Sequence, residues 1–265
     1  MPKILVVFSD THCGSRTGLM GPTHNLIEEP EVVIKASPGQ LWLHEAWNRL
    51  WDQVNAYIDG RPWVAACVGD AIEGLHHGKM QLVTEELADH YQIFMDVVYP
   101  KIQTATKRIF VLGTSCHTGN NEMILAKKCK AVKHPDSKRY AENRWLVNVG
   151  GTNIVLRHHI NVTSREHLRT NALSINLANE QLAAIRRGWP VPMGLVVGHR
   201  HVYDYIDDGT QFCLVCGPWQ LTTRFGHKNF SPMAPEPTLS IIDGTNGLEV
   251  VTFKATPEAP KCLKL

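Results

Sequence analysis

Runs of residues typical of buried strands alternate with runs of helical periodicity along most of this chain of 265 residues. The first run, Ile4–Phe8, is continuously apolar, as expected of a strand that is covered on both faces. Apolar residues then recur at helical spacing over 43–58, and Trp63–Val68 is the next strand-like run. This alternation predicts an α/β fold in which helices are layered on sheets.

The later elements follow the same pattern. Further strands are predicted at Arg108–Leu112, Trp145–Val149, Asn153–His158, Met193–Val197, Tyr203–Ile206, Gln211–Val215, Leu239–Ile242 and Leu248–Phe253. Further helices are predicted at 87–98, with Thr84 as N-cap, and at 120–131 and 166–187. Residues 13–39 are expected to form a long loop and 132–143 a basic surface excursion. A chain of this length fits one large domain, so we predict a single domain spanning 1–265.

The composition is that of an ordinary globular protein. Hydrophobic residues make up 43% and charged residues 20%, which argues against disorder, and the formal charge of +2 does not by itself imply nucleic acid. The seven cysteines are odd in number, and Cys213 and Cys216 form a lone CxxC, which argues against a zinc ribbon and indicates reduced thiols. Ile4–Phe8 is too short for a signal peptide, and no apolar stretch is long enough to cross a membrane. We therefore expect a cytoplasmic protein with no membrane partner.

Polar residues with metal-binding side chains follow the predicted strands. Asp10 and His12 come at the end of the first strand, two residues apart, so strand alternation would point both into one pocket. Asp70 follows the second strand behind Gly69, whose backbone can turn sharply. Taken alone, each aspartate is more commonly a turn residue than a metal ligand, and His12 would then be a nearby histidine with other partners.

Histidines end two later strands. His199 and His201 alternate after the strand 193–197, and this pair is a more specific signal than either aspartate motif. His158 and His159 end the strand 153–157, and alternation would let only one of them face the same pocket. The sequence does not choose between these two.

The set Asp-x-His, Gly-Asp, Gly…His, His and Gly-His-x-His, in this order, resembles the calcineurin-like metallophosphoesterase superfamily. The resemblance spans residues 10–201 and implies a four-layer α-β-β-α sandwich of two mixed β-sheets flanked by helices. It also implies two divalent metal ions, with manganese favoured and iron, zinc or nickel as alternatives. By resemblance Asp10, His12 and His201 would bind the first metal, Asp70 would bridge both, and His199 with His158 or His159 would bind the second.

The third motif departs from the family pattern. The usual Gly-Asn-His supplies an asparagine ligand, whereas this chain has Gly113-Thr114-Ser115-Cys116-His117, similar to a Gly-Thr-x-x-His variant in phage-encoded and bacterial members. His117 would then be the catalytic histidine. Thr114, Asn120 or water could replace the asparagine. Glu73 stands where family members often carry aspartate, and we expect it to support a ligand rather than bind metal.

The function implied is hydrolysis of a phosphoester by a metal-activated hydroxide. We favour a phosphodiesterase acting on nucleotides or nucleic acid, in the cytoplasm of a bacterium or a phage-infected host. His77, Thr114 and Arg200 are predicted to contact the substrate, although His77 could equally lie in an exposed polar loop. The alternatives are a phosphomonoesterase of nucleotides or proteins, a catalytically impaired metal-binding scaffold, and a nucleic-acid-binding protein that uses the basic stretch 127–139.

Overall fold

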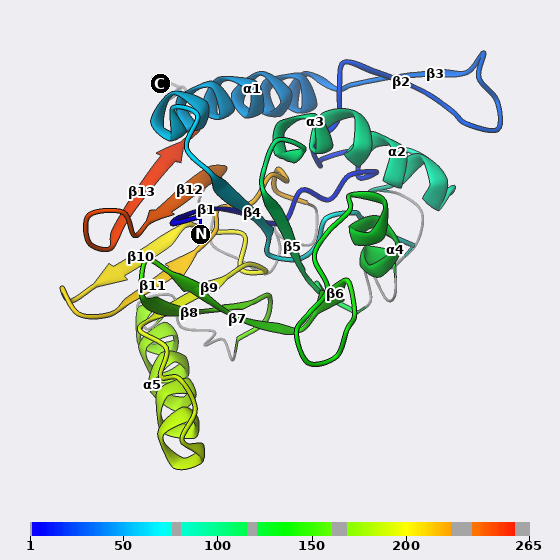
Figure 1. Cartoon of the computed structure of the whole chain (residues 1–265). Helices are drawn as coiled ribbons and strands as arrows, with labels where there is room; N and C mark the ends of the chain where they lie inside the picture. Colours follow the sequence, from blue (N-terminus) through cyan, green and yellow to red (C-terminus); the bar gives the residue numbers. More distant parts are fainter. Residues whose placement is uncertain (1, 76–80, 116–120, 161–168, 224–234, 258–265) are drawn as a thin grey trace, which may run out of the picture.

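The protein is built on two mixed β-sheets, seen in a computed structural model that describes residues 2–75, 81–115, 121–160, 169–223 and 235–257 (Figure 1). In the larger sheet the strands β1, β4, β5 and β6 run parallel, and β12 and β13 extend it antiparallel beyond β1. Their bounds, in spatial order, are β13 (Glu249–Lys254), β12 (Thr238–Asp243), β1 (Ile4–Phe8), β4 (Trp63–Cys67), β5 (Lys107–Val111) and β6 (Ala141–Glu142).

The second sheet has five strands and is also mixed. Its parallel centre is formed by β8, β9 and β11, while β7 and β10 pair antiparallel at the edges. In spatial order the strands are β10 (Asp204–Asp207), β11 (Phe212–Val215), β9 (Gly194–Val197), β8 (Thr152–Arg157) and β7 (Arg144–Val149).

Helices cover the outer face of each sheet. On the side of the larger sheet lie α1 (Pro38–Ile58), α2 (Leu87–Val97), α3 (Tyr99–Ile102) and α4 (Asn121–Lys128), and on the other side lies α5 (Arg169–Arg187). Alternate residues of β1 show the layers. Phe8 packs in the helix-side core against Trp47 and Trp51, at ring-centroid distances of 5.6 and 6.4 Å, while Leu5 and Val7 pack in the core between the sheets. The four-layer sandwich implied by the sequence resemblance is confirmed.

The start of α1 is specified locally. The hydroxyl of Ser37 accepts a hydrogen bond from the backbone N–H of Gln40, whose side chain accepts in return from the N–H of Ser37. Pro38 stands at the first helical position, where its missing N–H costs nothing. The amide of Gln40 also donates to the backbone oxygen of Ser15, so this helix start holds the loop after β1.

Three local predictions were wrong. The expected loop 13–39 contains a short hairpin, β2 (Thr23–Asn25) with β3 (Val33–Lys35), and the excursion 132–143 ends in the edge strand β6. Strands of two or three residues are too short for a periodic pattern to indicate them. Thr84 does not cap α2: the N-cap is Glu86, and the Thr84 hydroxyl accepts from the N–H of Glu86 ahead of the helix.

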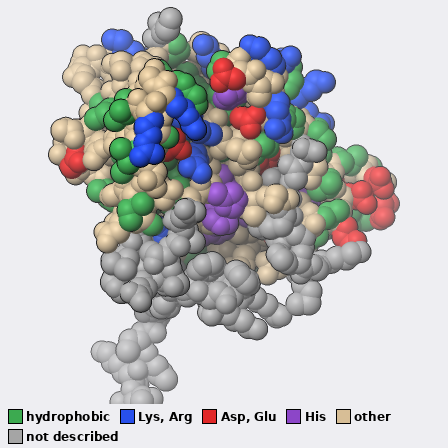
Figure 2. Space-filling view, turned by 90° about the horizontal axis from the view of Figure 1, so that it is seen from below, with side chains coloured by type: hydrophobic (Ala, Val, Ile, Leu, Met, Phe, Trp, Pro, Cys, Tyr) green, Lys and Arg blue, Asp and Glu red, His purple; other side chains and the backbone are tan. Residues whose placement is uncertain are grey.

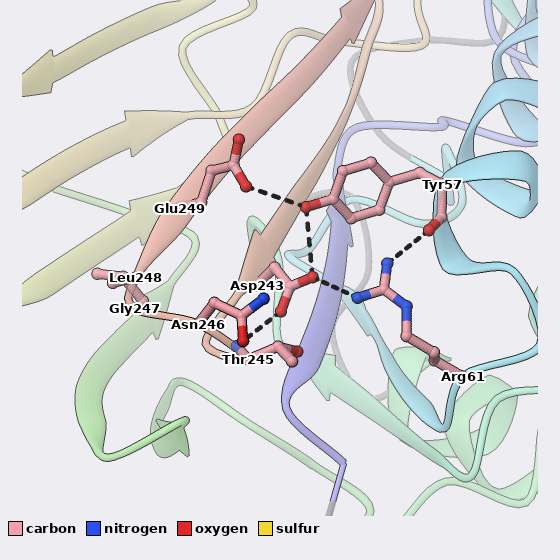
Figure 3. Close-up of a pocket in the computed structure, with 8 residues that line it drawn as sticks. All are labelled: Tyr57, Arg61, Asp243, Thr245, Asn246, Gly247, Leu248 and Glu249. Carbon is pink, nitrogen blue, oxygen red and sulfur yellow. Dashed lines mark hydrogen bonds and ion pairs between the residues drawn. The ribbon is translucent and has the colours of Figure 1, made fainter.

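A shallow pocket of about 330 Å³ lies where the end of α1 meets the β12–β13 turn (Figure 3). The Tyr57 hydroxyl donates to Asp243 and Glu249, and Arg61 pairs with Asp243 at 2.8 Å. Asp243 is paired with Ile4, at the start of β1, so the pocket is at the opposite end of the sheet from Asp10. Its polar side chains bond to one another, and we assign it a structural role in joining α1 to the sheet.

Candidate metal centre

The polar residues singled out in the sequence meet where parallel strands of both sheets end. Asp10 and Asp70 follow β1 and β4 in the larger sheet, whereas His158 and His199 follow β8 and β9 in the smaller one. The carboxyl ends of parallel strands are the usual place for a binding site in sheets of this kind. The centre therefore lies at one end of the seam between the two sheets.

The backbone is strained at this centre. Among the described residues, eight that are not glycine have a positive φ, and five of these are predicted ligands. These five are Asp10, His12, Asp70, His199 and His201, with φ between 42° and 68°. Such conformations are uncommon for residues other than glycine and gather at functional sites, where the surrounding structure holds them in place.

Asp10, His12 and His201 form the first group of potential ligands. The Nε2 atom of His201 lies 3.2 Å from Nε2 of His12 and 3.3 Å from Oδ1 of Asp10. Oδ2 of Asp70 lies 3.8 Å from Nε2 of His12, which brings the second aspartate to the edge of this group. Asp10 also accepts from the backbone N–H of His199, so it connects the ends of β1 and β9.

The second group surrounds Asp70 on its other side. Nε2 of His158 lies 3.0 Å from Oδ2 of Asp70. The Thr114 hydroxyl donates to the same Oδ2 at 2.9 Å and lies 3.3 Å from Nε2 of His158 and 3.2 Å from Nδ1 of His199. The ring of His159 lies 4.1 Å from that of His199 between centroids. Asp70 thus stands between two clusters of nitrogen and oxygen atoms.

Two histidines have their tautomers set by neighbours that only accept. Nδ1 of His12 is 2.7 Å from Oε2 of Glu73, and Nδ1 of His158 is 2.7 Å from the backbone oxygen of Val68. Each Nδ1 must therefore carry the hydrogen, which directs Nε2 into the centre. This is the arrangement by which proteins orient metal-ligating histidines.

Glycines allow the loops to approach closely. A Cβ at Gly69, whose φ is +93°, would collide with the ring of His158, and one at Gly113 would collide with Asp70. A Cβ at Gly198 would meet the hydroxyl of Ser9, which donates to Val68 at 2.7 Å. The glycines before Asp70, Thr114 and His199 are thus required by the close approach of neighbouring segments.

A buried carboxylate holds two of these loops together. Glu122, at the start of α4, accepts from the backbone N–H of Ala71 at 3.0 Å and from that of Gly113. Ala71 follows Asp70 and Gly113 precedes Thr114, so one side chain fixes the loops after both β4 and β5. Burial and the charge of Asp70 raise the pKa of Glu122 to about 7.

The pKa values of the groups in the centre are set by burial and by neighbouring charged side chains. Burial alone would lower the pKa of His12, but the charge of Glu73 overrides it and raises the pKa to about 9. Burial is likewise overridden at His158, where Asp70 raises the pKa to about 10. At His199 burial and the charge of His158 together lower the pKa to about 4. Burial would raise the pKa of Asp10, but its hydrogen bond to His201 and the charge of His158 bring it down to about 2.

The donor set fits divalent cations. Ligand atoms about 2.1 Å from a metal stand roughly 3.0–3.4 Å apart in octahedral or tetrahedral geometry. His201 lies at this spacing from both His12 and Asp10, while His12 and Asp10 are 3.9 Å apart. A mixture of imidazole and carboxylate suits manganese, iron or zinc better than magnesium. The protons that His12 and His158 hold beside the carboxylates are those that a cation would displace.

The structure brings most of the predicted residues to the centre. Those that meet are Asp10, His12, Asp70, Thr114, His158, His159, His199 and His201. His158 is buried against Asp70, whereas His159 is exposed at the rim beside His199. Arg200 is half-buried between its two histidines, with its backbone N–H on Gly198. His77 and His117 lie outside the described residues, as does Asn120.

Strand alternation, from which we predicted that these side chains meet in one pocket, does not explain how they meet. β1 ends at Phe8, β8 at Arg157 and β9 at Val197, so the ligands lie beyond the strands. Strand alternation therefore does not separate His158 from His159, and both reach the centre. Left-handed turns, not the pleat, point Asp10 with His12 and His199 with His201 into one pocket.

Two supporting residues escaped sequence reasoning. Glu122 belongs to a segment, Gly119-Asn120-Asn121-Glu122, that imitates the third motif, but no periodic signal marks its carboxylate as buried. Gln220 donates to Glu73 at 3.1 Å and to Ser15 at 3.1 Å, about 150 residues or more from either in sequence. Only the fold could reveal such partners. Glu73, expected to support a ligand, does contact His12.

The face that carries the centre has charged side chains of both signs around the histidines. Figure 2 shows histidine side chains exposed in the middle of this face, with Lys and Arg side chains above them on both sides and Asp and Glu side chains among these. In the stretch 127–139, Lys133 lies over the ring of Tyr140 and Arg139 pairs with Glu142 at 3.7 Å. Part of this basic stretch is thus engaged within the protein.

No family model and no curated protein matches the chain. Among solved structures, an archaeal phosphodiesterase has 10% identity and a TM-score of 0.47, over 95% of this chain and 99% of that one. The Vps29 protein of Entamoeba histolytica, in complex with zinc, has 13% identity and a TM-score of 0.39, over 95% and 98%. A 5′-nucleotidase precursor of Thermus thermophilus has 13% identity and a TM-score of 0.42, over 95% and 54%.

Similarities at this level of identity and TM-score carry no information about the activity of this chain. Within the described part of the chain, no helix has the length and apolarity needed to cross a membrane.

Proposed function

We propose that the protein is a binuclear metal-dependent phosphoester hydrolase. One observation carries the proposal: seven potential ligands from two sheets gather in two adjacent groups, and Asp70 lies within 3.8 Å of a histidine in each. Asp10, His12 and His201 would hold one cation, and His158 and His199 the other, with His159 at its rim. We favour manganese, with iron, zinc or nickel as alternatives.

Thr114 takes the place of the family's asparagine in this proposal. Its hydroxyl lies within 3.3 Å of atoms from Asp70, His158 and His199. A hydroxyl oxygen can bind a cation while donating to a carboxylate. We therefore assign Thr114 to the second cation rather than to the substrate, and leave Asn120 and water as the alternatives.

Two such cations, when bound, supply a water of lowered pKa and positive charge for the phosphoryl oxygens. The chain contributes the rest. Asp10 and Asp70 neutralise the cations, and Glu73 and the Val68 carbonyl keep His12 and His158 directed inward. Arg200 and His77 are proposed to contact the phosphoryl group, and His117 to hold the proton for the leaving oxygen.

We favour phosphodiesters of nucleotides or nucleic acid as substrates. The Lys and Arg side chains on both sides of the exposed histidines support this choice, because a polyanion gains from several surrounding cations and a small monoester from few (Figure 2). A proton donor such as His117 also matters more for an alkoxide leaving group than for an acidic one.

The test combines metal content with hydrolysis. We expect about two metals per chain by mass spectrometry and, with added manganese, faster turnover of bis-nitrophenyl phosphate than of nitrophenyl phosphate. Asp70→Asn should lose both metal and turnover. Asp59→Asn is the matched control, because Asp59 also has a left-handed backbone, at φ 46°, but caps α1 on the surface.

Other outcomes point to the alternatives. Faster turnover of nitrophenyl phosphate would make the protein a phosphomonoesterase. Two bound metals without turnover of either compound would favour the metal-binding scaffold. Nucleic-acid binding that depends on salt and survives removal of the metals would favour the binding protein. A chain that holds no metal after supplementation would contradict the proposal itself.

A further inference from the structure

Two surface regions far from the metal centre combine exposed hydrophobic residues with charges of one sign. Of the eleven large hydrophobics that are well exposed in the described part of the chain, seven belong to these two regions. The acidic tip consists of Ile27, Glu28, Glu29, Glu31, Val32 and Val33, between and at the ends of β2 and β3. The α5 ridge consists of Ile175, Leu182, Ile185, Arg186, Arg187 and Trp189.

The α5 ridge is one continuous stripe. Ile175, Leu182 and Ile185 are seven and three residues apart, which places them on one side of a helix. They are 50% to 62% exposed, while the opposite side of the helix buries Leu173 and Leu177 against the smaller sheet. Trp189 extends the stripe, with the guanidinium of Arg187 lying 4.7 Å from its ring centroid. A helix that only covered a sheet would not need an apolar outer side.

The helix presents this ridge rigidly. Glu180, near the middle of α5, accepts from Arg144 at 3.0 Å and from Arg157 at 2.9 Å, which ties the helix to β7 and β8. The amide of Gln181 donates to Pro192 and to Gln211. A fixed ridge loses little side-chain and backbone freedom when it is covered.

The acidic tip is also anchored at its base. His24 in β2 is buried and lies 2.8 Å from Asp89 of α2, and Asp89 accepts as well from the backbone N–H of Ile27. Beyond this anchor the three glutamates are exposed beside Ile27, Val32 and Val33. Figure 2 shows acidic and hydrophobic side chains together at one edge of the molecule, and Lys or Arg beside hydrophobic ones towards the other side.

We propose that the acidic tip of one molecule docks on the α5 ridge of a second copy of this chain. The two regions match in kind, because each has three or four apolar side chains and their charges are opposite: three glutamates against Arg186 and Arg187. They project at opposite ends of the molecule in Figure 1, so one molecule cannot join them to each other. The partner is therefore another copy, and the contact is head-to-tail.

The size of the two regions sets the strength of the contact. A tip of six residues covers less than the roughly 800 Å² per partner of a standard interface, so the association is weak and grows with protein concentration. A net charge of only +2 leaves little overall repulsion between copies. Because a head-to-tail contact leaves a tip and a ridge unused, assemblies grow beyond dimers or close into rings.

Charge reversal tests the pairing. Sedimentation velocity over a range of concentrations should show association of the natural chain that weakens at high salt. Two variants, Glu28→Lys with Glu31→Lys and Arg186→Glu with Arg187→Glu, should each associate roughly tenfold more weakly, the combined effect of a few exposed ion pairs. In an equimolar mixture the two should associate again, because each then offers the charge that the other lacks.

The controls separate this contact from general electrostatics. Lys127→Glu with Lys128→Glu reverses a comparable exposed pair at the end of α4 and should leave association unchanged. Leu182→Ser with Ile185→Ser should weaken association without any change of charge. Circular dichroism shows that each variant is folded. A natural chain that stays monomeric at every concentration overturns the proposal, as does a mixture of the two reversed variants that stays monomeric.

Discussion

The Nε2 atom of His12 lies 3.2 Å from the Nε2 atom of His201, although one histidine follows the larger sheet and the other the smaller. Nδ1 of His12 already donates to Glu73. The two Nε2 atoms can therefore share one proton or one cation between them, but no more. The pair thus joins the two sheets at the point where the proposed centre lies. A change that turns either ring away should loosen both the centre and this end of the seam.

Glu73 should control metal affinity without binding metal. Glu73→Gln keeps the size of the side chain but weakens the acceptor for Nδ1 of His12. We expect affinity for manganese or zinc to fall about 10–100-fold, the usual cost of losing such a partner. Isothermal titration calorimetry measures it. Glu45→Gln, an exposed change on α1, is the control, and equal affinities in the two variants would contradict this role.

The hydroxyl of Thr114 should decide how many metals are held. Thr114→Val keeps the shape but removes the oxygen that lies 3.2 Å from Nδ1 of His199 and 3.3 Å from Nε2 of His158. We expect metal content by mass spectrometry to fall from about two per chain towards one. Thr114→Ser restores the oxygen and should retain both. If the valine variant still holds two metals, Thr114 only positions Asp70.

Glu122 should make the metal-free protein less stable as pH rises. Its pKa is about 7 in the fold and near 4.5 when unfolded, so between these values the folded state binds more protons than the unfolded state. The free energy of unfolding therefore falls with rising pH across this window, by about 3 kcal/mol in total, and changes little above about pH 8.

Urea unfolding in the presence of a chelator measures this slope. Glu122→Gln cannot ionise, so its stability should depend less steeply on pH over the same window, whatever its absolute stability. The backbone N–H groups of Ala71 and Gly113 both face this side chain, so the amide will also fit less well. Parallel pH profiles for the two proteins would show that Glu122 does not titrate there.

Gly69 should be intolerant of any side chain. Gly69→Ala places a Cβ at φ +93° against the ring of His158, so we expect a loss of roughly 2–4 kcal/mol in the free energy of unfolding and weaker metal binding. Gly60→Ala has a similar φ of +69° but open space around the Cβ. It should cost only about 1 kcal/mol and leave metal binding intact. Equal costs would mean that backbone strain, not the collision, dominates.

Periodicity predicted the larger elements because burial imposes it. The main strands and α1 were predicted within a few residues, since their apolar residues must face a core. The hairpin of β2 and β3 and the edge strand β6 were missed because strands of two or three residues are too short to show a periodic pattern. The predicted end of α2 was close to the observed one, but the predicted N-cap was wrong. The Thr84 hydroxyl accepts from the N–H of Glu86, two residues ahead, and not from an N–H inside the helix.

The sequence by itself determined which residue types stand after which strands, and so the candidate ligands Asp10, His12, Asp70, His199 and His201. It did so because neighbouring parallel strands end at the same edge of a sheet, and the turns that follow them there are formed by glycine or polar residues. Only the tertiary structure decided that His158 contacts Asp70, that Glu73 orients His12 and that Glu122 joins two loops. These depend on left-handed turns and on contacts between segments far apart in the chain, which no local pattern encodes.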